Sequence, residues 1–442
     1  MPEVPRADAA SRPLGLVETS AYAAGSFATG VFSTVPAILL LYFCTEILRV
    51  RAAWASLIVF VPKVWAIAWD PLVGVWSDGA ATRIGRRRPF LIAGAVGVAA
   101  AFIAVFSPPS LSELGTAGWM AVTYFLLATL YSLFAVPYVA VPSELPVEAP
   151  VRARLVAWRM VIAMVGVLVG AGLVPHLVAF GGGGRTGYAH MSLLIAGACG
   201  IAMLLPVWML RGRDRAGPDR ARPTRVWTQL GAVLRERAFL WLSGSYVLQL
   251  TAVGIISATA PYLVTGAFRR DEGDIGTAMI GMLSATTLSM PLWAWAGRRF
   301  GTARMLAAAV VLFAAGAALI AMLALASSSW TTARLAFALT GIPFAGMQVL
   351  PYTLVAHLVH DCAREGAAGE SSFTGVWTAA EKLGLAFGPA LTGIVLALSE
   401  AGTTRAVAAF ALGGPAILGL ASLPLLASAS RARSAPGARV VS

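Results

Sequence analysis

The stretch Asp70-Pro-Leu-Val-Gly-Val-Trp-Ser-Asp78-Gly-Ala-Ala-Thr-Arg83-Ile-Gly-Arg86-Arg87-Arg88-Pro89 decides the fold, because it joins two apolar segments. An apolar run from Trp54 to Trp69 precedes it, and another from Phe90 to Phe106 follows it. Runs of this length fit a bilayer, since a membrane-spanning helix needs about 20 mainly apolar residues. The stretch therefore predicts a tight basic turn at one membrane face, entered from a helix that carries an acid.

Composition extends this interpretation to the whole chain. Of its 442 residues, 58% are hydrophobic and 12% are charged, whereas roughly a quarter of the residues of a soluble domain are charged. We expect an all-α membrane protein with twelve transmembrane helices. The twelve apolar runs lie at residues 18–47, 53–76, 90–107, 117–141, 156–180, 188–210, 238–265, 275–297, 303–325, 332–356, 371–398 and 404–428.

The net charge of +13 comes from arginines whose positions indicate how the chain is oriented in the membrane. Arginines concentrate in short loops and at both ends, which is how cytoplasmic segments are marked, so no nucleic-acid partner is expected. This pattern predicts a multi-pass protein of the cell inner membrane with both termini cytoplasmic. Residues 1–17 lack the features of a signal peptide. The three cysteines, Cys44, Cys199 and Cys362, have no pairing or zinc-ligand spacing, and neither a metal nor a cofactor is expected.

An internal repeat divides the chain into two halves. Pro71-Leu72 recurs 220 residues later as Pro291-Leu292, and Val136-Pro137-Tyr138 recurs 214 residues later as Leu350-Pro351-Tyr352. Repeats of this kind predict two parallel six-helix bundles, as in the major facilitator fold, with substrate bound near the bilayer midplane. The predicted parts are residues 1–211 (N-terminal bundle), 212–237 (basic cytoplasmic linker), 238–428 (C-terminal bundle) and 429–442 (cytoplasmic tail).

Ionisable residues inside the predicted spans mark candidate functional positions. A charge at the centre of a bilayer costs about 2.5 to 3.5 kcal/mol even on permissive scales, so it needs a partner or a wet cavity. For Asp70, a proton or cation site remains open beside a structural role, either as an ion pair with Lys63 or as a fixed pivot. Arg159 and Lys382 are expected to line the central cavity, with extension to the cytoplasmic face as the alternative. His357 and His360 have the spacing of a pH-sensitive pair but lack the further ligands of a metal site.

Three motifs together resemble the glycoside-pentoside-hexuronide:cation symporters, the melibiose-permease-like branch of the major facilitators. They are Asp70-Pro-x2-Gly74-x3-Asp78-x4-Arg83-x-Gly85-Arg-Arg-Arg-Pro89; Val136-Pro-Tyr138-x5-Glu144 leading to Arg152-x-Arg154-Leu-x2-Trp-Arg159; and Pro351-Tyr352 leading to Gly375-Val-Trp377-x3-Glu381-Lys382-Leu-Gly384-x3-Gly388-Pro389.

The resemblance implies a secondary transporter and assigns roles to named residues. Cation coupling falls to Asp70, Ser132 and Lys382. For substrate binding, the resemblance points to Arg159 and Lys382. The aromatic residues are predicted separately, because their rings could stack on a sugar ring or an apolar tail, with helix packing as the alternative; they are Trp69, Tyr131, Tyr138 and Trp377. Gating falls to Gly74, Asp78, Arg83, Gly85, Arg86, Arg87 and Arg88. A helix-end carboxylate close to several arginines can form charge-assisted bonds in one state and release them in another.

The chain departs from this family at positions that matter for its chemistry. Ala66 and Trp69 stand where members with a sodium site carry a second carboxylate and a small polar group, so the sodium site looks incomplete. One acid suffices to carry a proton, whereas a metal cation needs several oxygen ligands. Gly30 and Ala135 stand where the sugar-binding branch carries acids, which weakens a sugar assignment.

The function expected from the sequence is alternating-access symport of a small organic solute, either glycoside-like or amphiphilic. The coupling ion is a proton or, as the second choice, sodium, and the protein is expected to work as a monomer in the lipid bilayer. A proton-coupled antiporter that exports a secondary metabolite or drug-like compound is the alternative. A multi-span enzyme or sensor is disfavoured, because the sequence has no nucleophile set, no HExxH, no P-loop and no soluble output domain.

Overall fold

A computed structural model describes residues 15–80, 82–145, 147–211, 231, 233–364, 370–399 and 403–434. Within this part of the chain, twelve helical segments are long and apolar enough to cross a membrane, and no β-strand occurs. The predicted all-α membrane fold is therefore confirmed. The segments are Leu16–Ile47, Ala52–Asp78, Arg88–Phe106, Glu113–Glu144, Pro150–Phe180, Gly184–Met209, Arg237–Ala267, Glu272–Phe300, Thr302–Leu325, Trp330–Val359, Phe373–Leu398 and Thr404–Arg431.

The chain forms two compact units, which are described separately. Unit 1 comprises Met1–Pro36, Glu46–Val50 and Val61–Arg220, and unit 2 comprises Ala37–Thr45, Arg51–Phe60 and Ala221–Ser442. The change from one unit to the other near Arg220 falls within the predicted linker, much of which lies outside the described residues. The boundaries of the two predicted bundles stay a prediction.

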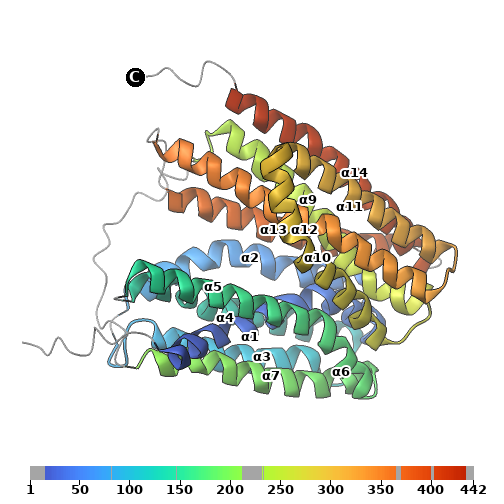
Figure 1. The fold of residues 1–442 in the computed structure, drawn as a ribbon. Helices are drawn as coiled ribbons and strands as arrows, with labels where there is room; N and C mark the ends of the chain where they lie inside the picture. Colours follow the sequence, from blue (N-terminus) through green and yellow to red (C-terminus); the bar gives the residue numbers. More distant parts are fainter. Residues whose placement is uncertain are drawn as a thin grey trace, which may run out of the picture. The chain divides into compact units, whose positions relative to one another are not determined.

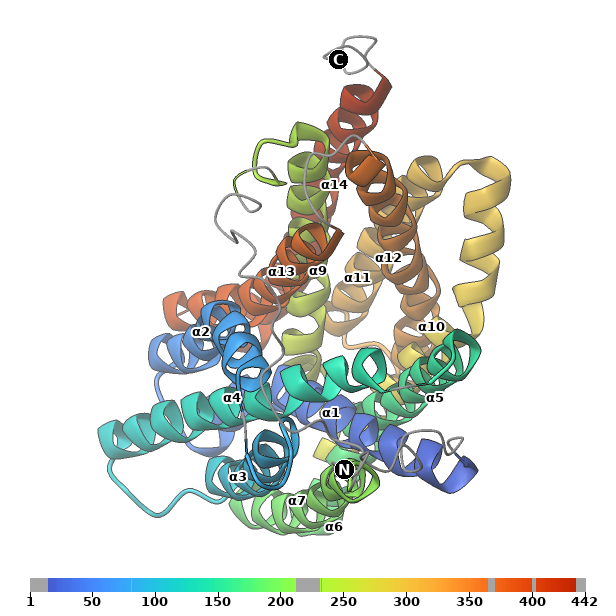
Figure 2. The same ribbon diagram turned by 90° about the vertical axis from the view of Figure 1, so that its left-hand side faces the viewer.

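Unit 1 is built around α3, which packs against α4 and α7 (Figures 1 and 2). A π-helical turn, Val169–Leu173, joins α5 to the short α6, so that both belong to one span. The helices of this half are α1 (Leu16–Tyr42), α2 (Ala52–Asp78), α3 (Arg88–Phe106), α4 (Glu113–Glu144), α5 (Ala149–Leu168), α6 (Val174–Phe180) and α7 (Gly184–Met209).

Unit 2 is built around α9, which packs against α13 and α14 (Figure 2). A second contact series links α10 and α11 to α12. The helices of this half are α9 (Arg237–Tyr262), α10 (Glu272–Phe300), α11 (Thr302–Leu325), α12 (Trp330–Arg364), α13 (Glu370–Leu398) and α14 (Thr403–Ser434).

Local sequence signals explain where several helices begin. The side chain of Ser112 accepts a hydrogen bond from the backbone N–H of Gly115 at the start of α4, and Asp271 does the same for Asp274 at the start of α10. These caps satisfy N–H groups that have no partner within the helix. Proline in the first turn of α3 and of α5 fits positions where the missing N–H costs nothing.

Exposed apolar side chains cover the outer faces of the spans. Leu194 and Ile201 on α7, Val122 on α4 and Leu312 on α11 are all more than half exposed. A soluble protein rarely carries large apolar patches, whereas hydrocarbon chains solvate such side chains well. The surface of both units therefore suits a lipid bilayer.

The repeat seen in the sequence is present in the backbone. Both α1 and α9 end in a π-helical turn, Phe43–Ile47 in the first half and Leu263–Ala267 in the second. Each turn is followed by an arginine with positive φ, which is 58° at Arg49 and 52° at Arg269. Positive φ is uncommon for residues other than glycine. The recurrence of this rare geometry after 220 residues, the same offset as the sequence echo, supports the two-repeat architecture.

Glycines allow the first and fifth helices of each unit to meet at backbone distance. A Cβ atom on Gly30 of α1 would lie 2.4 Å from the carbonyl oxygen of Ala163 in α5. In unit 2, a Cβ atom on Gly388 of α13 would lie 2.3 Å from the carbonyl carbon of Gly254 in α9. Neither position accepts a side chain without movement of the backbone. Gly30 is therefore a packing residue, and this explains why no acid stands there.

Candidate functional site

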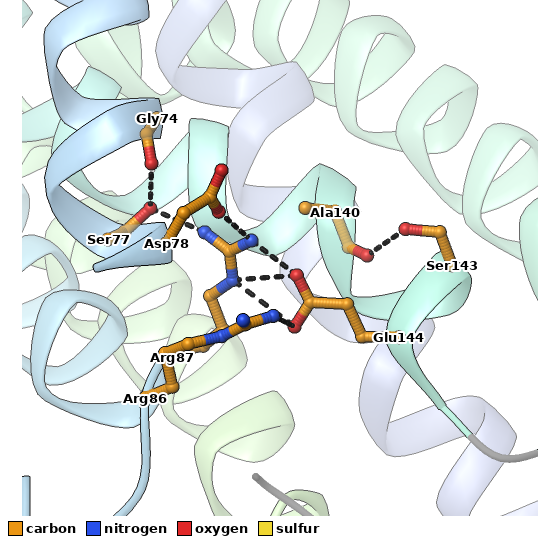
Figure 3. A network of polar contacts seen from close by, with 8 residues as sticks. All are labelled: Gly74, Ser77, Asp78, Arg86, Arg87, Ala140, Ser143 and Glu144. Atoms are coloured by element: carbon orange, nitrogen blue, oxygen red, sulfur yellow. Dashed lines mark hydrogen bonds and ion pairs between the residues drawn. The ribbon is translucent and has the colours of Figure 1, made fainter. Parts of the chain in front are cut away.

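The loop between α2 and α3 forms a polar network with the end of α4, which we call the arginine network. Its members are Ser77, Asp78, Arg86, Arg87 and Glu144, all in unit 1 (Figure 3). Arg87 donates hydrogen bonds to Ser77 at the end of α2, pairs with Asp78 and Glu144, and is only 4% exposed. Its Nε atom lies 3.1 Å from Oε1 and 3.3 Å from Oε2 of Glu144. A single guanidinium thus ties together the ends of two helices.

Glu144 completes the arginine network, although no gating role was predicted for it from its place in the second motif. It terminates α4, where the partial negative charge of a helix C-terminus disfavours a carboxylate. Two guanidinium groups offset this effect, because Arg86 Nη2 also lies 2.7 Å from Glu144 Oε2. Charge-assisted hydrogen bonds of this type are about twice as strong as neutral ones. The clue available in the sequence was its place six residues after Tyr138 in the second motif.

The remaining predicted gating residues shape the loop around the arginine network. Arg88 donates from Nε to the carbonyl oxygen of Val207 (3.2 Å) near the end of α7 and from Nη1 to that of Ile84 (3.1 Å). Gly85 has a φ of 114°, a backbone conformation that residues other than glycine rarely adopt. Arg83 is exposed. The carbonyl oxygen of Gly74 accepts a hydrogen bond from the hydroxyl of Ser77 at 3.0 Å. The predicted gating residues therefore lie at the end of α2 and in the loop that follows it, with different roles there.

Asp70 lies half-buried in α2, and aromatic residues surround this part of the helix. It interacts electrostatically with Tyr131 of α4, whose hydroxyl donates to the carbonyl oxygen of Thr29 at 3.3 Å. Trp69 donates from Nε1 to the carbonyl oxygen of Thr129 at 3.1 Å and stacks on Trp65, with ring centroids 5.5 Å apart. The structure thus brings Asp70, Trp69 and Tyr131 to the contact between α2 and α4.

The other predicted coupling residues have different surroundings. Ser132 is buried and donates its hydroxyl hydrogen to the carbonyl oxygen of Ala128, one turn earlier in α4, at 3.2 Å. Lys382 is half-buried in α13 and belongs to unit 2, whereas Asp70 belongs to unit 1. Joint coupling by these three residues stays a prediction.

A tyrosine pair in unit 1 holds the next predicted site residues. Tyr22 of α1 and Tyr138 of α4 have ring centroids 4.7 Å apart, and each hydroxyl donates to the other's backbone carbonyl oxygen, at 2.8 and 2.6 Å. Tyr138 also hydrogen-bonds to Ser26 at 2.9 Å. Arg159 of α5 interacts electrostatically with both phenols. Tyr138 is fully buried, and Arg159 is half-buried beside it.

A second tyrosine pair occupies the equivalent place in unit 2. Tyr246 of α9 and Tyr352 of α12 have ring centroids 6.1 Å apart, and Trp377 of α13 stacks on Tyr246 at 4.4 Å with an angle of 7° between the rings. Trp377 is 3% exposed. The hydroxyl of Tyr352 donates to Oε2 of Glu381 at 2.9 Å. Glu381 belonged to a quoted motif but to none of the predicted site classes.

The histidine prediction can be followed only in part. His357 is exposed on α12, whereas the side chain of His360 lies outside the described residues. Within the described part of the chain, no group of three or more His, Cys, Asp or Glu side chains is placed to hold a metal ion.

Comparison with known proteins identifies the family. The family model for the MFS/sugar transport protein matches residues 21–417. The inner membrane symporter YicJ of Escherichia coli K12 is 25% identical over 295 residues, which cover 64% of this chain and 62% of that protein. The sodium-dependent lysophosphatidylcholine symporter 1 of Xenopus tropicalis is 25% identical over 299 residues, which cover 59% and 56%. The chain spans 40% to 62% of the length of three bacterial relatives that it matches.

A solved structure has the same fold. The crystal structure of a D-xylose-proton symporter superimposes with a TM-score of 0.70 over 92% of this chain and 96% of the other, at 15% sequence identity. At this identity the likeness concerns the fold alone. Family and fold together point to transport across a membrane.

Proposed function

We propose that this chain, which belongs to the MFS/sugar transport protein family, is an alternating-access symporter that couples uptake of a small organic solute to entry of a proton. Membership of the family makes it a transporter of the major facilitator superfamily. The coupling ion, the solute and the roles of individual residues belong to the proposal. The single observation that carries the choice of ion is the position of Asp70 in α2, with Ala66 and Trp69 as its neighbours on the helix.

A proton suits Asp70 better than sodium does. Hard cations are bound by several oxygen ligands, whereas a proton needs one carboxylate oxygen. Ala66 offers no ligand, and the indole of Trp69 is a donor that is bound to the carbonyl oxygen of Thr129. Proton coupling requires one group that binds and releases a proton during the cycle, and a single carboxylate can serve this role. Lys63, which lies in the same helix and the same unit, is the cation that would balance the ionised form.

The arginine network supports gating by the loop that follows α2. Rearrangement of α2, α3 or α4 would stretch the contacts of Arg87 with Asp78 and Glu144, so the network favours the arrangement in which these helix ends are close. Its release in the other state of the cycle is part of the proposal.

For the solute, we propose a molecule with substantial apolar surface, either an amphiphile or a glycoside with an apolar part. The stacked rings of Trp65 and Trp69, with Phe125 5.2 Å from Trp65, present more aromatic than polar surface near Asp70. Gly30 leaves no room for the acid that would bind sugar hydroxyls at that position. A relative whose name states lysophosphatidylcholine transport fits this preference.

The same reasoning yields a proposed orientation. Arg83, Arg86, Arg87 and Arg88 mark their loop as cytoplasmic under the positive-inside rule. We therefore propose that both termini are cytoplasmic. We also propose that the protein works as a monomer in the cell inner membrane.

A ligand screen tests the proposed solute class. Purified protein is heated with single lysophospholipids, single glycosides or single free sugars, at two pH values, with and without sodium. We expect an amphiphile or an apolar glycoside to raise the apparent melting temperature, since a ligand at 100 times its Kd stabilises by about 2.7 kcal/mol. Stabilisation by free sugars alone would contradict the proposed solute class.

A further inference from the structure

Glu381 is an acidic residue inside a membrane span, and the proposed mechanism gives it no role. It lies about two helical turns inside the segment Phe373–Leu398 and is half-buried. A carboxylate at such a position is unfavourable unless it is compensated or takes up a proton.

The surroundings of Glu381 provide neutral groups at close range. The hydroxyl of Tyr352 donates to Oε2 at 2.9 Å, and the tightly stacked rings of Tyr246 and Trp377 lie behind Tyr352. The titratable groups that face the carboxyl group within the described residues are Tyr352 from α12, Tyr246 from α9 and Lys382 from α13 itself. Lys382 is the next residue of α13 and projects from a different face of the helix, so its influence on Glu381 is electrostatic.

Trp377 of α13 packs beside Tyr352, the hydrogen-bond partner of Glu381, with ring centroids 6.0 Å apart, and is 3% exposed. Helix α13 crosses α9 at this level, because a Cβ atom on Gly384 would lie 2.7 Å from Cβ of Leu250.

The two units differ in the charge that they bring to their tyrosine pairs. In unit 1 the cation Arg159 faces Tyr22 and Tyr138, whereas in unit 2 the acid Glu381 faces Tyr246 and Tyr352. The repeat has therefore kept the aromatic framework and changed the ionisable group. Only the acid can take up a proton and become neutral.

We propose that Glu381 and Tyr352 form a proton-binding site in unit 2, separate from Asp70. Tyr352 keeps its own proton and donates to Oε2, so the added proton binds Oε1 of Glu381. This inference rests on the proposed symport cycle, in which the site takes up a proton from one side of the membrane and releases it to the other.

Infrared spectroscopy of the full-length protein in liposomes tests the site without a solute. The carbonyl stretching band of a protonated carboxylic acid is compared at about pH 6.5, where an ordinary exposed glutamate is less than about 1% protonated. We expect this band in the wild type, its loss in Glu381→Gln, and its retention in Asp70→Asn. In Tyr352→Phe the band should persist at higher frequency, because the carbonyl group loses its hydrogen-bond donor.

Two outcomes would overturn the proposal. One is a band of equal intensity in Glu381→Gln and the wild type. If Glu381→Gln does not fold, the other is an unchanged band frequency in Tyr352→Phe. Because Asp70→Asn is measured in parallel, the result is independent of whether Asp70 couples transport.

Discussion

Arg87 is a buried cation whose every nitrogen donates to a named partner at the ends of two helices. Nη1 donates to Ser77, Nη2 to Asp78 and Glu144, and Nε to Glu144. Arginine suits this position, because its planar fork engages a carboxylate with two parallel bonds, which lysine cannot do. The residue is 4% exposed, so its contribution to stability should exceed that of an arginine on the surface.

Removal of Arg87 should therefore destabilise unit 1. Breaking a buried ion pair from one side costs about 3 to 5 kcal/mol, and the half-exposed Asp78 reduces this figure. We expect Arg87→Ala to lower the apparent melting temperature of the purified protein by several degrees. Arg83→Ala, on the same loop but exposed, is the matched control and should change stability by less than about 0.5 kcal/mol. Equal losses in both variants would show that the arginine network does not carry this energy.

The residues of this loop could be predicted from the sequence, but the partner of Arg87 could not. A run of arginines after a helix-end acid indicates a charged gate wherever it occurs, and Asp78 was placed in it on that ground. Glu144 lies 57 residues further along the chain, and only the packing of α4 against α3 brings it to the loop.

At the scale of helices, close crossings fix the geometry of each unit. Gly30 and Gly166 let α1 and α5 touch, since a Cβ atom on Gly166 would lie 2.2 Å from the carbonyl oxygen of Phe27. Gly254 and Gly388 do the same for α9 and α13. Gly30 stands where the sugar-binding branch carries an acid, and the structure gives the physical reason, which is the absence of space for any side chain.

This crossing can be tested with a conservative change. Gly30→Ala should lower the apparent melting temperature, because the added methyl group must displace the backbone of α5, and overpacking of this kind costs about 1 to 3 kcal/mol. Gly118→Ala in α4 is the control, since a Cβ atom there meets nothing within 4 Å and alanine favours a helix over glycine. Equal stability of Gly30→Ala and Gly118→Ala would contradict the close approach of α1 and α5.

The spans themselves were predictable because their signal is strong. Each of the twelve predicted runs overlaps one observed segment, and runs of apolar residues this long leave few alternatives. The π-helical turns that end α1 and α9, and the one that joins α5 to α6, could not be foreseen. They depend on local changes of hydrogen bonding that leave no hydrophobic pattern.

At the scale of the whole molecule, the two repeats share a backbone plan and differ in chemistry. The ends of α2 and α4 and the loop after α2 hold the buried arginine network, whereas the last turn of α10 carries the exposed Arg298 and Arg299 and is followed by Gly301 with φ of 95°. The tyrosine pairs are retained, while the ionisable residue beside them changes from Arg159 to Glu381. Composition and repeat spacing predicted the shared plan, but these differences arise from side chains whose neighbours only the fold defines.

Proton coupling predicts that sodium has no specific effect on the whole transporter. At constant pH and ionic strength, replacement of potassium by sodium should leave the apparent affinity for a stabilising solute unchanged, because Asp70 lacks the second carboxylate of a sodium site. The measurement is a thermal-shift titration of the solute in each salt. A several-fold gain in affinity with sodium would instead reveal coupling between the two binding events.

The most direct test of the account is transport by Asp70→Asn in liposomes, with the solute identified in the ligand screen. Asparagine resembles the protonated acid in size and neutrality but cannot release a proton. We predict that an inward proton gradient no longer drives accumulation of the solute, while exchange of labelled for unlabelled solute continues. Accumulation at the wild-type level in this variant would contradict the assignment of Asp70 as the coupling residue.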